Sequence, residues 1–113
     1  MTLYDICTEI AEIEDGLYYG DIDFSYDNLM STMKPGHPAD ILDDILSLIG
    51  EDVSEGKTPD ITTLWQTLGA LREFKKAFKV KQVSEPIKHL KEYIENIEKE
   101  NRAQKQKKNK KIK

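Results

Sequence analysis

The chain has 113 residues, 34% of them charged, and a net charge of −4, so it forms one domain with a narrow core. Its apolar runs are far shorter than the ~20 residues that a membrane-spanning helix needs, and its start lacks the regions of a signal peptide. The single cysteine, Cys7, excludes an internal disulfide and fits a reducing compartment. We therefore expect a cytoplasmic protein without a membrane segment.

The small net charge hides two halves of opposite sign. Residues 1–60 carry 15 Asp and Glu against Lys34 and Lys57, which gives a formal charge of −13. Residues 61–113 carry 15 Lys and Arg against six Glu, which gives +9. Such polarity bears on association with charged partners rather than on the fold.

The first predicted helix begins after Thr2 and ends at Gly16 or Gly20. Thr2 and Asp5 have the spacing of a capping box. Apolar residues recur at intervals of three and four, as in a helix that buries one face. Acids occupy the other faces, where a solvated surface is the simpler interpretation. The apolar positions are Leu3, Ile6, Ile10, Ile13 and Leu17, and the acids are Asp5, Glu9, Glu12, Glu14 and Asp15.

The segment from residue 17 to 27 is ambiguous. Residues 21–27 alternate polar and apolar side chains, which is typical of a half-buried strand, and residues 78–81 form the one other alternating run. Ser25 is also a good N-cap for a short helix up to Met33. Because other strand signals are lacking, we predict a loop followed by that short helix.

Residues 34–38, Lys-Pro-Gly-His-Pro, break the chain before the next helix. This helix should start at Pro38 and end at Gly50, and a polar loop should follow over residues 51–57. Its outer side carries Asp40, Asp43 and Asp44. Its inward residues are Ile41, Leu42, Ile45, Leu46, Leu48 and Ile49.

Residues 58–80 should form the central helix of the core. Thr58 is its candidate N-cap, Pro59 suits the first helical position, and Asp60 complements the helix dipole. The only Trp, Trp65, lies here, so we expect the core to be built around it. The apolar face consists of Ile61, Leu64, Leu68, Leu71, Phe74 and Phe78.

A last helix should begin at Ser84. Its apolar residues, which should face the core, are Ile87, Leu90, Ile94 and Ile97. Residues 101–113 hold seven Lys and Arg and no acid, so they cannot bury enough surface to offset their ordering entropy. We predict an all-α fold, a small bundle of four to five helices over residues 1–100 with a disordered basic C-terminal tail over residues 101–113.

No metal or cofactor site is expected. Asp21-x-Asp23-x-Ser25-x-Asp27 imitates the start of an EF-hand loop, but Tyr26 stands where the loop needs Gly, and Thr32 where it needs Glu. His37, His89 and Cys7 lack the spacing of zinc ligands. They are interpreted as a loop histidine, a histidine on a helix surface and a thiol at the edge of the core.

Catalytic motifs are also missing from the sequence. It has no Gly-rich phosphate loop, no Gly-x-Ser-x-Gly elbow and no His-Glu-x-x-His. The adjacent Asp43 and Asp44 point about 100° apart on a helix and cannot share one proton. We therefore expect a protein that is not an enzyme.

The first functional hypothesis is a small protein-interaction module, a regulator or inhibitor whose acidic helical surface docks on a basic protein such as one that handles nucleic acid. Accessory proteins of mobile elements are of this type. Tyrosine beside carboxylates suits such a surface, although these rings could instead cover the edge of the core. The candidate partner-binding residues are Tyr18, Tyr19, Asp21, Asp23, Asp27, Asp40, Asp43, Asp44, Glu51 and Asp52.

The alternative is a nucleic-acid-associated accessory protein that binds phosphates through its C-terminal tail, weakly and with a strong salt dependence. A solubilising tail, or one folded back over the acidic face, is an equally simple interpretation. A monomer or a weak homo-oligomer is expected, because the seams of the first and last helices could pair within or between chains. The candidate phosphate-binding residues are Arg102, Lys105, Lys107, Lys108, Lys110, Lys111 and Lys113.

Overall fold

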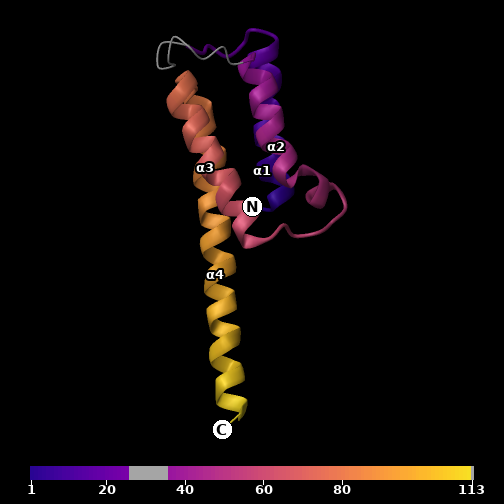
Figure 1. Cartoon of the computed structure of the whole chain (residues 1–113), viewed down its shortest axis with the longest axis vertical. Coiled ribbons are helices and arrows are strands. Elements are labelled where there is room, and N and C mark those ends of the chain that lie inside the picture. Colours follow the sequence, from indigo (N-terminus) through magenta and orange to yellow (C-terminus); the bar gives the residue numbers. More distant parts are fainter. Residues whose placement is uncertain (26–35, 113) are drawn as a thin grey trace.

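The computed structural model describes residues 1–25 and 36–112, with side chains described as far as Asn101. Four α-helices and one short 3-10 turn make up the regular structure of these residues, which contain no strand (Figure 1). The helices are α1 (Leu3–Tyr18), α2 (Pro38–Ser54), α3 (Ile61–Phe78) and α4 (Ser84–Ile112), and η1 (Lys81–Val83) precedes α4. The predicted all-α bundle is confirmed.

Each helix packs against its neighbours in sequence, and α4 closes the bundle against α1. Contacts between α1 and α3, or between α2 and α4, are absent from the described part, so these pairs lie on the diagonals. Successive helices run in opposite directions (Figure 1). The arrangement is an up-down-up-down four-helix bundle. None of its described helices is both long enough and apolar enough to cross a lipid bilayer.

The first helix begins and ends as its sequence predicts. The Thr2 hydroxyl accepts from the Asp5 N–H at 3.1 Å, and the Asp5 carboxylate accepts from the Thr2 N–H at 3.0 Å, which completes the capping box. Gly20 follows the helix with φ +82°. The Asp21 N–H then donates to the carbonyl of Gly16 at 2.8 Å, the 6→1 bond of a Schellman motif.

Two other predicted helix ends are wrong. Gly50 does not end α2, which continues to Ser54, because packing of Ile49 and Val53 on the core outweighs the ~1 kcal/mol that one glycine costs a helix. Thr58 and Pro59 do not start α3. The helix begins at Ile61 after Asp60, whose side chain makes no capping hydrogen bond.

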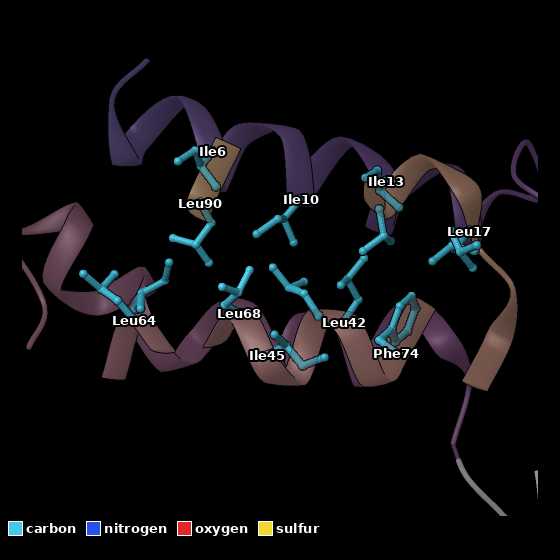
Figure 2. Packing of buried hydrophobic residues seen from close by; sticks show 14 of the residues in the cluster. Ile6, Ile10, Ile13, Leu17, Leu42, Ile45, Leu64, Leu68, Phe74 and Leu90 are labelled. Atoms are coloured by element: carbon cyan, nitrogen blue, oxygen red, sulfur yellow. The ribbon is translucent and has the colours of Figure 1, made fainter. Parts of the chain in front are cut away.

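The core consists of the inward faces of all four helices (Figure 2). Every apolar position predicted for α1 is buried. On α2 one prediction is wrong, because Leu48 is 46% exposed on the outer side of the helix. The apolar residues with no more than 1% exposure are Ile6, Ile10, Leu17, Leu42, Ile49, Leu64, Leu68, Leu71, Val80, Val83, Leu90 and Ile94.

Trp65 is not the centre of this core. It is 41% exposed, and its indole N–H donates to the Glu98 carboxylate of α4 at 3.0 Å. Leu64 and Leu68, on either side of it along α3, are fully buried instead. The indole bridges the outer edges of α3 and α4 because a donor on the flank of an apolar face finds a polar partner there.

The ambiguous segment after α1 is a loop as far as Ser25, as predicted. The Ser25 N–H donates to the Phe78 carbonyl at 2.8 Å, which joins the two alternating segments, but residues 21–25 and 78–81 form no strand. Ile22 and Phe24 pack against the core. The short helix predicted up to Met33 lies outside the described residues.

The last helix is much longer than the other three. It runs from Ser84 to Ile112, and its final turns project beyond the bundle on the side where the chain begins (Figure 1). The longest dimension of the molecule is 60 Å as a result. The basic C-terminal segment is thereby carried away from the body of the protein.

Candidate functional site

The acids predicted on the outer side of α2 do lie there. Asp40, Asp43 and Asp44 are exposed in its first two turns. Glu51 is exposed and Asp52 is half-buried in its last turn, which was expected to be a loop. Negative charge at a helix C-terminus opposes the helix dipole, and no basic residue occupies that turn. This helix is therefore acidic at both ends, although only its N-terminal acids favour the helix.

The C-terminal half of α1 adds a carboxyl group to this surface, because α1 and α2 pack antiparallel. Partial burial, the charge of Asp43 on α2, a hydrogen bond with the Asp43 carboxyl group, and the charges of Asp15 and Asp40 together raise the pKa of Glu14 to about 7. Two carboxyl groups that hydrogen-bond share a proton. Glu14 and Asp43 thus form a carboxyl pair that bridges the two helices.

No cation balances the pair within the described ranges 1–25 and 36–101. The ion pairs found there join Lys57 to Glu55 and His89 to Glu9 and Glu85, so none involves Glu14, Asp15, Asp40, Asp43 or Asp44. The same ranges hold no group of three or more His, Cys, Asp and Glu arranged for a metal ion. The face bearing these five acids, called the acidic face below, combines carboxyl groups that have no ion-pair partner among the described residues with a rigid helical backbone.

Glu14 was not among the residues selected from the sequence. The sequence pattern of α1 shows Glu14 only as one of several polar residues and does not distinguish it from the other acids. The signal that could have found it is topological, since consecutive helices of a bundle pack antiparallel and place the end of the first beside the start of the second. Both of those ends are acidic in this chain.

The tyrosines selected from the sequence lie at the end of α1. Tyr18 and Tyr19 are 68% and 74% exposed, and their rings meet edge to face at 5.1 Å. They do not cover the edge of the core, which was the alternative interpretation. Tyr18 is four residues beyond Glu14, so both lie on one side of α1. An exposed aromatic ring therefore adjoins the carboxyl pair.

The other acids predicted to bind a partner come after α1 in the chain and are not part of the acidic face. Asp21 and Asp23 are exposed in the loop after α1. Asp27 lies outside the described residues. The side chains from Arg102 onward, which include all the candidate phosphate-binding residues, also lie outside the described part, and the position of Lys113 is not described at all.

A second acidic spot lies on the opposite side of α1, against α4. His89 was expected on a helix surface, but it is half-buried, and its Nδ1 lies 2.8 Å from the Glu9 carboxylate. Its Nε2 lies 3.7 Å from the carboxylate of Glu85. A shallow cavity of about 270 Å³ adjoins it, lined by Glu9, Glu12, Ile13, Ile22, Gln82, Glu85 and Pro86. Here a histidine lies between two of the acids, unlike at the Glu14–Asp43 pair.

Comparisons of the chain with models of known protein families, with characterised proteins and with solved structures find no match.

Proposed function

We propose that this protein is a non-enzymatic interaction module whose acidic face binds a basic surface of another protein, and that it acts there as a regulator or inhibitor. The single observation that supports this most is the Glu14–Asp43 carboxyl pair between two helices, which has no ion-pair partner among the described side chains. Like charges packed together oppose folding, so an arriving Lys or Arg side chain removes an unfavourable interaction as well as adding a favourable one.

The shape of the face supports the same function. Its carboxylates project from two packed helices, so they lose little conformational freedom when a partner binds. Tyr18 and Tyr19 add exposed aromatic area beside them, which is typical of residues that dominate binding energy. A rigid array of carboxylates can also occupy a site meant for phosphates. A basic protein that handles nucleic acid is therefore the class of partner we favour.

Affinity capture from the native cell tests the proposal with two matched variants of the full chain. The first carries Asp43→Lys, Asp44→Lys and Glu51→Lys on α2. The second carries Glu92→Lys, Glu95→Lys and Glu100→Lys on α4. Both sets are exposed and change the net charge equally. We expect the α4 variant to retain the partner and the α2 variant to lose it, with capture by the wild type weakening as salt is raised.

Circular dichroism of each variant shows whether the fold is kept. Equal capture by both variants, or capture that does not respond to salt, would contradict the proposal. The alternative function is phosphate binding by the basic segment 101–113, and the projection of this segment away from the acidic face favours it. Nuclease treatment of the captured material distinguishes this function from protein binding. In that case nuclease releases the captured material, and the α2 variant captures as much as the wild type.

A further inference from the structure

An apolar groove runs along the outer side of the α1–α2 pair. Its volume is about 260 Å³, slightly below the range usual for small-molecule pockets. Gly50 leaves part of it open, because a Cβ atom built there would meet nothing within 4 Å. Tyr4, at one end, is 68% exposed. The lining residues are Tyr4, Cys7, Thr8, Ala11, Leu46, Gly50, Val53 and Ser54.

The groove and the carboxyl pair belong to one continuous stripe. Ala11 lies three residues before Glu14 on α1, and Leu46 lies three residues after Asp43 on α2, so each pair shares a helix face. The stripe therefore offers an apolar trough with an acidic end. It suits a chain segment that presents an aliphatic side chain close to several positive charges.

The chain contains such a segment at its own C-terminus. Residues 101–113 hold seven Lys and Arg and no acid, and their one large apolar residue, Ile112, stands between Lys111 and Lys113. This segment cannot reach the acidic face of its own molecule as an extension of α4. It projects past the bundle on the side of the N-terminus (Figure 1), whereas Glu14 lies near the opposite end of α1.

We propose that the C-terminal segment 101–113 of one copy binds the α1–α2 groove and acidic face of a second copy. The inference rests on the proposed function, because it names a basic chain for the same surface. Two copies that exchange their segments form a closed pair with two-fold symmetry. In such a pair the seven positive charges of each segment lie against the acidic face of the other copy. A separate basic partner would then have to displace this segment.

Sedimentation velocity of the full chain tests the inference. We expect a dimer at low salt and a monomer at 0.5 M salt, where the Debye length falls to roughly 4 Å. Gly50→Leu fills the groove, and Lys108→Glu with Lys110→Glu and Lys111→Glu lowers the formal charge of the segment from +7 to +1. Each should weaken dimerisation by about tenfold or more. Gly69→Leu is the matched control, since Gly69 is also an open helical position but lies on α3.

Mixing charge-reversed variants gives a second, independent readout. The variant Glu14→Lys with Asp43→Lys and the segment variant should each be monomeric, and an equimolar mixture should form heterodimers, because the unchanged segment of the first variant can then bind the unchanged acidic face of the second. A wild type that stays monomeric at low salt overturns the inference, as does a dimer that Gly50→Leu and the segment variant leave intact. The capture experiment can still succeed in either case, so the two proposals fail separately.

Discussion

At the scale of single residues, Glu14 distinguishes this surface from an ordinary acidic helix. Most exposed carboxylates are dispersed enough for water to screen them. Glu14 is partly withdrawn from water and faces Asp43 across the helix interface, and both effects raise its pKa to about 7. Near neutral pH the pair therefore carries a proton that a cationic partner can displace.

The raised pKa of Glu14 predicts how stability depends on pH. The folded state holds this proton up to about pH 7, whereas the unfolded chain releases it near the ordinary glutamate pKa of 4.5. The contribution of Glu14 is thus most favourable below pH 4.5 and is lost as pH rises to and beyond 7. Glu14→Gln should therefore gain stability relative to the wild type between pH 5 and pH 8, as measured by urea unfolding.

Glu92→Gln serves as the control for this pH dependence, because Glu92 is exposed on α4. The difference in unfolding free energy between Glu92→Gln and the wild type should stay nearly constant over the same pH range. If Glu14→Gln behaves like Glu92→Gln, the carboxyl pair does not exist in solution.

At the scale of elements, the loop after α1 folds back onto that helix. The N–H groups of Asp21 and Ile22 donate to the Gly16 carbonyl at 2.8 and 3.0 Å. The Ile22 side chain lies so close to Gly16 that a Cβ atom there would come within 2.5 Å of its Cδ1. Glycine at position 16 thus lets the loop seal the end of the bundle next to the acidic face.

This contact predicts opposite effects of alanine at two helical glycines. Gly16→Ala should lower the free energy of unfolding by roughly 1–3 kcal/mol, because Ile22 has to move in a packed environment. Gly69→Ala should raise it by roughly 0.4–1 kcal/mol, because nothing lies within 4 Å and alanine restricts the unfolded chain. Chemical denaturation of both variants measures the two values. Equal stabilisation by both would show that the loop does not pack on Gly16.

The elements could be predicted from the sequence wherever local chemistry decides them. The seam of α1 and its Thr2–Asp5 box depend only on residues three and four apart, and both are confirmed. Helix ends decided by tertiary packing were missed, as Gly50 inside α2 shows. The prediction that Trp65 is buried was also wrong. Trp65 lies on the edge of the apolar face, and its exposure depends on a hydrogen bond to Glu98 of another helix, which the sequence of α3 does not reveal.

At the scale of the whole molecule, the separation of positive and negative charge could be predicted from the sequence, but not which charged side chains lie next to each other in the fold. The two oppositely charged halves are evident from composition. The pairing of Glu14 with Asp43 requires α1 and α2 to lie side by side, which periodicity within one helix cannot reveal. The groove beside them likewise appears only once two helices supply its walls. The acids that matter are therefore selected by packing and not by charge density along the chain.

The central claim is that a basic chain binds this protein on the outer side of α1 and α2. Amide chemical-shift mapping tests it most directly, with a synthetic peptide of residues 101–113 added at low salt to the labelled full chain carrying Lys108→Glu, Lys110→Glu and Lys111→Glu. We predict shifts at Glu14, Asp43 and Gly50 that disappear when Asp43→Lys, Asp44→Lys and Glu51→Lys are added. Shifts that spread equally to Glu92 and Glu95 on α4, or no shifts at all, would contradict the account.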